Sequence, residues 1–168
     1  MQGGAGLSAG ITLKRATLSD AEALHLMQVI AFAPLLEKYR DTAISPARES
    51  LDRVREKLIQ RETRFYFIML GRAAVGAIRV VIPDKPEKRK AIAPVFIMEK
   101  YRNRGYAQRA IDAVEGLYGK DHWALDTILE ERGNCHLYEK LGYHRVGKSR
   151  VNERMTIVDY EKDWEELP

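Results

Sequence analysis

Hydrophobic residues along this chain follow two different spacings. Strand-like stretches, in which hydrophobic residues alternate with polar ones or form short runs, cover residues 11–15, 64–70, 73–82, 91–98, 123–128, 143–150 and 155–160. Helical spacing, with hydrophobic residues three or four positions apart, covers residues 20–33, 45–60, 106–118 and 131–141. The predicted element order is therefore β-α-α-β-β-β-α-β-α-β-β, and neither an internal repeat nor an interdomain linker interrupts it.

Signals for helix ends are clear in the first third of the chain. Ser19 and Glu22 have the spacing of a capping box, which predicts the start of the first helix. Pro34 is expected to end or break that helix, and residues 35–44 fit either a further helical turn or a loop packed on the core. The Ser45-Pro46 pair indicates the start of the second helix.

Turn and bulge signals organise the strands that follow. Gly71 separates two hydrophobic runs, so residues 64–82 predict a hairpin with a tight turn. Pro94 lies inside the next strand, where its missing N–H indicates a bulge or a loss of pairing. Antiparallel hairpins that lead into a β-α-β unit are typical of a mixed α/β (α+β) single domain.

The composition agrees with one globular domain. The chain has 168 residues, of which 45% are hydrophobic and 31% charged, so it is long enough to bury a sizeable core. We assign residues 11–160 to this domain, residues 1–10 to a flexible Gly/Ala/Ser-rich tail and residues 161–168 to an acidic tail. The first ten residues lack the features of a signal peptide, and no run approaches transmembrane length.

Charge and cysteine content narrow the function classes. The net charge of +4 suits a small anionic ligand, but the basic residues are interleaved with 24 acidic ones, so we expect neither a nucleic-acid nor a membrane partner. Cys135 is the only cysteine, which excludes an internal disulfide and fits a cytoplasmic location. The four histidines lack metal-ligand spacing, so no metal is expected.

The most informative stretch joins the strand at residues 91–98 to the next helix. Two arginines and a glycine stand where that helix begins, in the run Arg102, Asn103, Arg104, Gly105, Tyr106 and Ala107. A helix N-terminus presents unpaired N–H groups and a partial positive charge, and arginine adds charge-assisted hydrogen bonds. The stretch fits either a phosphate or pyrophosphate site or an ordinary loop with solvated arginines.

Two motifs together resemble the GCN5-related N-acetyltransferase (GNAT) family. Arg102, Gly105 and Ala107 match the family's acyl-CoA-binding motif, written R-x-x-G-x-A, between the fourth strand and the third helix. Asn134 and the run LYEKLGY at residues 137–143 are similar to its penultimate strand–helix unit. The resemblance implies a mixed, mostly antiparallel sheet of six or seven strands, flanked by about four helices and splayed between strands 4 and 5.

The resemblance also implies which residues would bind acetyl-CoA. Backbone N–H groups of residues 103–107 would hold the pyrophosphate, with the Arg102 and Arg104 side chains helping to neutralise it. The pantetheine arm would pair with the backbone of Ile97 and Glu99 in the gap beside the fourth strand. Glu99 is a departure, because the family often has proline there. Asn134 matches a position that contacts coenzyme A, with a helix N-cap as the alternative role.

The implied reaction is direct attack of a primary amine on the thioester. Tyr138 matches the family's general acid for the departing thiolate, although a core aromatic has the same spacing. The N–H of Met98 would donate to the thioester oxygen.

The resemblance does not single out one residue as the general base. Ala91 occupies a position where some relatives carry a glutamate, so Glu99, Asp126, His122 or a chain of waters are the candidates. A route through an acyl-cysteine at Cys135 is less favoured, because no base lies beside it in the sequence.

Three functions are compatible with these residues. The first is N-acetyltransfer from acetyl-CoA to a small-molecule or peptide amine, and the second is a non-catalytic acyl-CoA-binding regulatory module. A different nucleotide-phosphate binder is disfavoured, since neither a P-loop nor a G-x-G-x-x-G motif occurs. In the family, the acceptor side corresponds to residues 32–44 and 150–155, and the positive net charge argues against a polycationic acceptor. A homodimer is a further expectation, because the family often dimerises.

Overall fold

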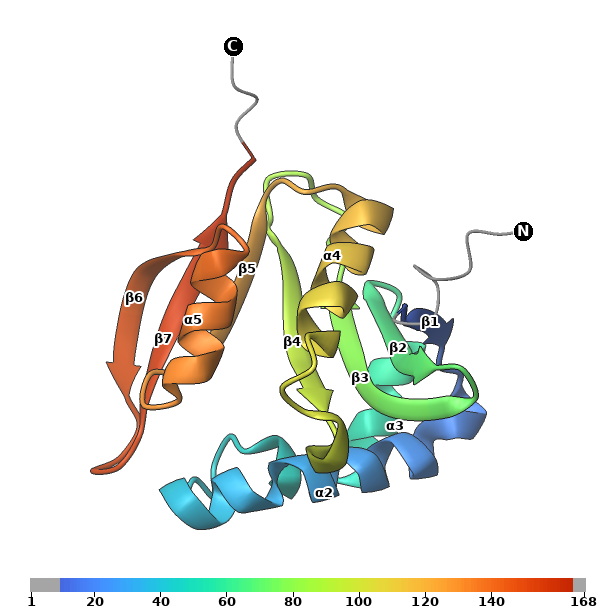
Figure 1. Cartoon of the computed structure of the whole chain (residues 1–168), viewed down its shortest axis with the longest axis horizontal. Helices are drawn as coiled ribbons and strands as arrows, with labels where there is room; N and C mark the ends of the chain where they lie inside the picture. The colour runs from blue at the N-terminus through green and yellow to red at the C-terminus, as the bar shows by residue number, and fades with distance from the viewer. Residues whose placement is uncertain (1–9, 165–168) are drawn as a thin grey trace.

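The computed structural model describes residues 10–164, and its elements keep the predicted order (Figure 1). The strands are β1 (Thr12–Arg15), β2 (Thr63–Leu70), β3 (Ala73–Val81), β4 (Lys90–Ile97), β5 (Trp123–Ile128), β6 (His144–Arg150) and β7 (Thr156–Lys162). The α-helices are α2 (Ala21–Tyr39), α3 (Leu51–Ile59), α4 (Tyr106–Tyr118) and α5 (Arg132–Lys140). Residues 1–9 and 165–168 of the two predicted tails lie outside the described part, and β7 extends into the predicted acidic tail as far as Lys162.

All seven strands form one mixed sheet in the order β1-β2-β3-β4-β5-β7-β6. Neighbouring strands are antiparallel except β4 and β5, which are parallel. That parallel pair is joined only at Lys90–Trp123 and Ala91–Ala124, close to where both strands begin. Figure 1 shows β4 and β5 together at one end of the sheet and apart at the other. The predicted mixed sheet, splayed between its fourth and fifth strands, is confirmed.

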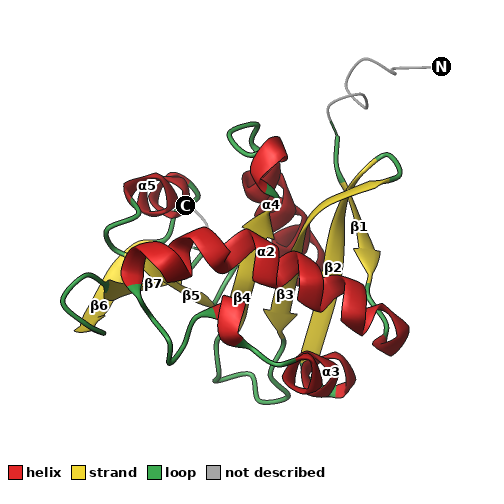
Figure 2. Cartoon of the chain, turned by 90° about the horizontal axis from the view of Figure 1, so that it is seen from below, coloured by secondary structure: helices red, strands yellow, loops and turns green. Residues whose placement is uncertain are grey.

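Helices cover both faces of the sheet (Figure 2). α2 and α3 pack on the face that carries Phe65, Phe67 and Phe96, whereas α4 and α5 pack on the face that carries Tyr66 and Ile68. Because both of its faces are covered, β2 is a nearly continuous hydrophobic run and not an alternating one. The split between β4 and β5 therefore has α2 and α3 on one side and α4 and α5 on the other.

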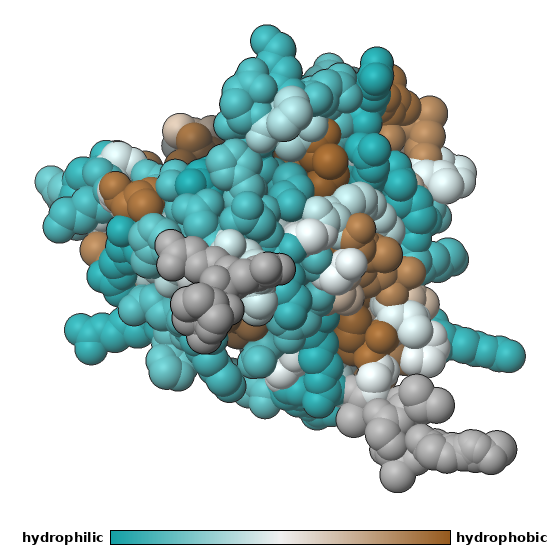
Figure 3. All heavy atoms as spheres, turned by 90° about the horizontal axis from the view of Figure 1, so that it is seen from above, coloured by the Kyte–Doolittle hydropathy of each residue, from teal (hydrophilic) through white to brown (hydrophobic). Residues whose placement is uncertain are grey.

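The surface seen in Figure 3 is mostly hydrophilic, with hydrophobic side chains in separate groups. None of the helices in the described part of the chain has the length and hydrophobicity needed to span a bilayer.

Helix starts differ in detail from the prediction. Thr17 and Asp20, not Ser19 and Glu22, form the capping box, which heads a 3₁₀ turn that leads into α2. The Asp20 carboxylate accepts the Thr17 N–H at 2.8 Å, so the shorter acid two residues earlier takes the role predicted for Glu22.

The second predicted start is displaced in the same way. Ser45 caps only a 3₁₀ turn (Pro46–Arg48), and α3 begins later, where the Ser50 hydroxyl accepts the Arg53 N–H at 3.1 Å.

Pro34 does not end the first helix. α2 continues through it to Tyr39 and stops at Arg40, which has a φ of +57° and donates its N–H to Leu36. Pro34 is exposed, so water can bind the carbonyl that loses its helical donor, which lowers the cost of proline at this position. Residues 35–39 are therefore helical, which settles the alternative left open by the sequence.

The bulge predicted at Pro94 is confirmed. The Ala93–Pro94 peptide is cis, and the β3–β4 register shifts between Ile78 and Val80. Arg79 lies opposite this break, and its Nη1 donates to the Ala93 carbonyl at 2.5 Å. The irregular part of β4 thus faces the split in the sheet.

Candidate active site

The loop between β4 and α4 presents a row of unpaired N–H groups. Residues 103–108 donate no backbone hydrogen bond to an acceptor within residues 10–164, and the α4 ladder begins only with Arg109 N–H to Gly105 O at 3.1 Å. Asn103 and Gly105 have φ values of +63° and +79°, which turn the chain into the helix. A Cβ built on Gly105 would meet no heavy atom within 4 Å. The donors therefore border open space that an anion can occupy.

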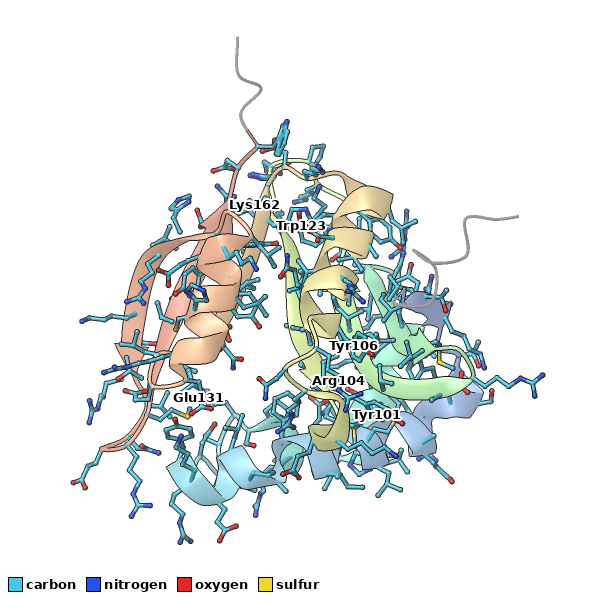
Figure 4. All side chains as sticks on the ribbon, viewed as in Figure 1. Tyr101, Arg104, Tyr106, Trp123, Glu131 and Lys162 are labelled. Carbon is cyan, nitrogen blue, oxygen red and sulfur yellow. The ribbon has the colours of Figure 1, made fainter. Side chains whose placement is uncertain are left out.

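The two arginines of this loop have different surroundings. Arg102 donates from Nε to the Ile97 carbonyl at 2.8 Å and from Nη2 to the Ala31 carbonyl at 3.1 Å. Its side chain ties the loop to β4 and α2, so Arg102 positions the loop, while its predicted part in neutralising the pyrophosphate stays a prediction. Arg104 is exposed and lies on the loop just before Tyr106, the first residue of α4 (Figure 4). It is the arginine whose side chain can reach an anion at the helix start.

The backbone of β4 offers a donor to the split, but it is not Met98. The Met98 N–H donates to the Val75 carbonyl of β3 at 2.8 Å, so the thioester donor predicted there is already used. Hydrogen-bonding direction alternates along a strand, so the N–H of Ile97 points the other way, towards β5. Pairing with β5 ends at Ala91, which leaves the Ile97 N–H facing the split. Its carbonyl accepts from Arg102, and Glu99 starts a 3₁₀ turn (Glu99–Tyr101).

A pocket of about 450 Å³ lies where β4 and β5 separate. Its lining includes Asp126 of β5 together with Asn134 and Tyr138 of α5, and on the opposite side Gln28 of α2 and Arg79 of β3. Because α5 and α2 cover different faces of the sheet, the pocket connects the two faces through the split. A ligand that enters from the α4–α5 face and one that enters from the α2–α3 face can therefore meet inside it.

Tyr138 combines a buried ring with a hydroxyl that has no partner among the described residues. The residue is 7% exposed, and its ring packs against Tyr143 and Tyr160 at centroid distances of 6.3 and 6.1 Å. Burial raises the pKa of Tyr138, and the charges of Asp126 and Cys135 raise it further. Tyr138 lines the pocket, and its hydroxyl makes no hydrogen bond with the described residues. It is thus a protonated phenol that can donate to a ligand.

Asn134 lies one helical turn before Tyr138 and also lines the pocket. The N-cap of α5 is Glu131, so the alternative in which Asn134 caps this helix is wrong. Its exposed side chain is on the pocket side of α5, where a ligand can reach it.

Among the three base candidates, Asp126 lies in the pocket. Its cross-strand partner is Asp159 of β7, and neither carboxylate forms an ion pair with the described residues. Desolvation raises the pKa of Asp126, and the like charge of Asp159 raises it further. A carboxylate with a raised pKa is a stronger base than an ordinary one.

The other two candidates are elsewhere. Glu99 is exposed and is not part of the pocket lining. His122 is held near the paired ends of β4 and β5, with its Nε2 3.2 Å from the Glu87 carbonyl and its Nδ1 3.7 Å from Asp163. The sequence alone could not show which of these three residues lies in the pocket, because that depends on where β4 and β5 end.

The C-terminal end of α2 is fastened to the opposite half of the sheet. The Tyr39 hydroxyl donates to Glu131, and Lys38 Nζ lies 2.7 Å from the same carboxylate. Asn152, in the β6–β7 turn, donates to the Tyr39 carbonyl at 2.9 Å. Figure 4 shows Glu131 at the end of α5 that faces α2. The two segments expected on the acceptor side, residues 32–44 and 150–155, are therefore joined here.

Within residues 10–164, no three or more His, Cys, Asp or Glu side chains are grouped so as to hold a metal ion.

Together these features define a split-sheet protein with unpaired N–H groups at a helix start beside the split. The acetyltransferase (GNAT) family model matches residues 32–143, which is two thirds of the sequence, so the chain belongs to this family.

Solved structures share the fold at low sequence identity. An acetyltransferase from Thermus thermophilus superposes with a TM-score of 0.67 at 17% identity, covering 92% of this chain and 97% of that one. A spermidine N-acetyltransferase from Vibrio cholerae, in complex with CoA and spermine, gives a TM-score of 0.70 at 15% identity, with coverages of 90% and 94%. The PaiA N-acetyltransferase from Thermoplasma acidophilum, in complex with coenzyme A, gives 0.67 at 12% identity, with coverages of 92% and 99%.

A partial match of another kind occurs among curated proteins. An ATP-dependent 6-phosphofructokinase 1 from Thermus thermophilus is 31% identical over 88 residues, which is 46% of this chain. The chain spans only 27% of the length of that relative, and this share carries no inference about activity.

Proposed function

We propose that the protein is an N-acetyltransferase that moves the acetyl group of acetyl-CoA to a primary amine by direct attack on the thioester. The observation that supports the proposal is that the split joins two sets of polar groups, both without a hydrogen-bond partner among the described residues. N–H groups at the start of α4 lie beside the split, the split leads to the hydroxyl of Tyr138, and neither set has a partner within residues 10–164. A pyrophosphate fits the first set, and a departing thiolate needs the second. Relatives of the same fold are found in complex with coenzyme A, which supports this choice of cofactor.

Each group has a distinct task in this scheme. The Ile97 N–H donates to the thioester oxygen and stabilises the charge that develops there. Asp126 accepts a proton from the attacking amine, directly or through one water. As the amine nitrogen forms its bond to the acetyl carbon, the carbon–sulfur bond breaks, and Tyr138 donates its proton to the leaving sulfur. Atoms and charge balance once Tyr138 regains that proton from solvent and Asp126 releases its own.

A non-catalytic acyl-CoA-binding module is the alternative function. It requires the helix start but makes no use of Tyr138 or Asp126. Thiol release from acetyl-CoA, measured with a panel of primary amines, separates the two functions. Tight acetyl-CoA binding without amine-dependent thiol release would favour the module.

The site itself is tested by Gly105→Glu. Cβ at this position points into open space, so the glutamate places bulk and negative charge where the pyrophosphate is proposed to lie. We expect acetyl-CoA binding to be lost in a calorimetric titration. Gly105→Ala is the matched control, because it carries the same positive-φ penalty without the charge and should keep most of the affinity. Equal affinities for the wild type and Gly105→Glu would place the cofactor elsewhere.

The cellular setting follows from the same proposal. Cys135, the only cysteine, is buried and reduced, and we place the enzyme in the cytoplasm, where acetyl-CoA is available. Assembly as a homodimer is part of the proposal by analogy with the family.

A further inference from the structure

The α2–α3 end of the pocket holds an ion pair that is already satisfied. The Glu49 carboxylate accepts from Gln28 Nε2 at 3.1 Å with one oxygen and from Lys57 Nζ at 2.5 Å with the other. Both Glu49 and Lys57 are largely buried, so the two charges compensate each other with little help from solvent. Asp41, another carboxylate of the lining, accepts N–H groups of its own loop.

Arg79 stands beside this pair without a carboxylate of its own. It lines the pocket from β3, and its one hydrogen bond within the described chain runs from Nη1 to the Ala93 carbonyl. Its Nε is buried and has no partner, and Arg79 forms no ion pair with the described residues. Burial lowers the pKa of Arg79, while the charge of Glu49 opposes that shift. Lys57 and Arg79 are balanced in number by Glu49 and Asp41, but Glu49 is bound by Lys57 and Asp41 by N–H groups of its own loop, so Arg79 is the cation of this lining whose charge is not paired directly.

The amide of Gln28 completes the polar end of the pocket. Gln28 is 1% exposed and donates to the Pro46 carbonyl and to Glu49, but its Oε1 has no partner among the described residues. A buried donor on Arg79 and a buried acceptor on Gln28 are thus both unmet in one small region. Such groups cost free energy unless another molecule or a rearrangement supplies partners.

The opposite charge lies across β4. Asp126 faces the pocket from β5, whereas Arg79 faces it from β3, so one strand and the split separate the two side chains. Two strand spacings of about 4.8 Å place their backbones roughly 10 Å or more apart. A ligand that meets both groups therefore carries a cationic or amine end and an anionic end several bonds apart.

We propose that the acceptor is a primary amine that also carries an anionic group, a carboxylate or a phosphate-like group several bonds from the amine, and that Arg79 binds this anionic group. This inference rests on the proposed acetyltransfer and names the acceptor class for the same pocket. Arginine suits the task because its planar donor fork matches both kinds of anion. Nη2 makes no hydrogen bond with the described residues and is not among the fully buried atoms, so it is the donor left for the anion, while Nε can contribute only if the pocket wall shifts around it.

Matched pairs of acceptors test the proposal. Glycine, 4-aminobutanoate and 6-aminohexanoate are each compared with the corresponding amide, which keeps the amine and removes the negative charge. 3-Aminopropylphosphonate distinguishes a phosphate-like group from a carboxylate. The readouts are kcat/KM from thiol release and, by calorimetry, the affinity of the CoA complex for the N-acetylated acid and amide. We expect the longer acids to exceed their amides by about 10- to 100-fold in kcat/KM, as a hydrogen-bonded charge pair would give.

Two variants test whether Arg79 causes the preference for acids over amides. Arg79→Gln should remove the acid-over-amide ratio, whereas Arg72→Gln, which makes the same charge change in the exposed β2–β3 turn, should keep it. Arg79 also supports the β4 bulge, and a loss of that support alone would lower the rates with acid and amide equally. Thermal melting and acetyl-CoA affinity check that the variant is folded.

Equal rates and equal binding for acids and amides in the wild type would overturn the inference, as would a ratio that survives in Arg79→Gln. In either case, the proposed acetyl transfer to primary amines without an anionic group would still stand. Absence of any acetyl-CoA binding would instead refute the proposed function itself, so the two failures are distinguishable.

Discussion

Replacing Tyr138 with phenylalanine tests the chemistry most directly. The Tyr138 hydroxyl makes no hydrogen bond with the described residues, so Tyr138→Phe removes a proton donor to the ligand without breaking a contact inside the protein. The ring stays in its place against Tyr143 and Tyr160. We therefore expect the free energy of unfolding to change by less than about 0.5 kcal/mol.

The size of the catalytic effect follows from the role of a general acid. Such groups contribute about 100- to 10,000-fold in rate, and water can replace part of the effect where a pocket is open. We expect kcat to fall about 100-fold, which corresponds to roughly 2.7 kcal/mol of lost transition-state stabilisation. The dissociation constant of acetyl-CoA should stay within about twofold, because the phosphate contacts at α4 are untouched.

Tyr143, which packs against Tyr138, provides a control in which stability and not catalysis is expected to change. Tyr143 donates to the buried carboxylate of Glu115 at 2.8 Å, and Lys162 binds the other oxygen of that carboxylate at 2.7 Å. Tyr143→Phe should therefore lower the free energy of unfolding by about 1–3 kcal/mol while kcat stays near the wild-type value. Both variants are measured by thiol release and by chemical denaturation. A wild-type kcat in Tyr138→Phe, at an unchanged stability, would refute its role as the acid.

Two further predictions concern Asp126 and Gly76. The test of Asp126 uses an acceptor such as a hydrazide, whose amine stays neutral in weak acid. Its kcat/KM should fall as the pH drops through the pKa of Asp126, which is raised above 3.8. Asp126→Asn should lose this pH dependence and at least about tenfold in rate. Since a raised carboxyl pKa means that ionisation disfavours the fold, Asp126→Asn should melt no lower than the wild type at neutral pH, and an unchanged pH profile would exclude Asp126 as the base. A Cβ on Gly76 would lie 2.1 Å from the Phe96 carbonyl oxygen, so Gly76→Ala should push β4 away, cost about 1–3 kcal/mol and lower acetyltransfer. Gly116→Ala, at an open position of α4, should instead be neutral or slightly stabilising, and equal stabilities of the two alanine variants would contradict the close packing of β3 and β4.

Hydrophobic spacing was sufficient to predict the element order and most strand limits. The exceptions lie where exposure or capping chemistry decides, as at Pro34, whose exposed position lets α2 continue. Serine at residue 45 had the right chemistry for a cap, but the chain turns again before α3 starts after Ser50. Local patterns identify a residue able to cap a helix, whereas the three-dimensional path selects which of two such residues does so.

The site was predictable where its signal lies in consecutive residues. The turn at Gly105 and the position of Tyr138 on α5 follow from short motifs, and the pocket brings Tyr138 together with Asn134. The direction of a backbone N–H depends on strand register, so the sequence could not show that Met98 donates to β3 while Ile97 faces the split. Arg79 belongs to no sequence motif, and only the structure shows that its buried Nε has no partner and that it forms no ion pair with the described residues.

The irregularities of β4 connect these separate features. A regular strand would pair along its whole length with β5 and leave no room for a ligand, but pairing ends at Ala91 and the register with β3 breaks near Pro94. Arg79 binds the carbonyl exposed at the break, and Arg102 binds the carbonyl of Ile97 farther along the same strand. The two arginines thereby hold a strand that beyond Ala91 pairs only with β3, one from the proposed acceptor side and one from the proposed cofactor side. The backbone donor of Ile97 is fixed between them, and the proposed stabilisation of a developing oxyanion requires such preorganisation.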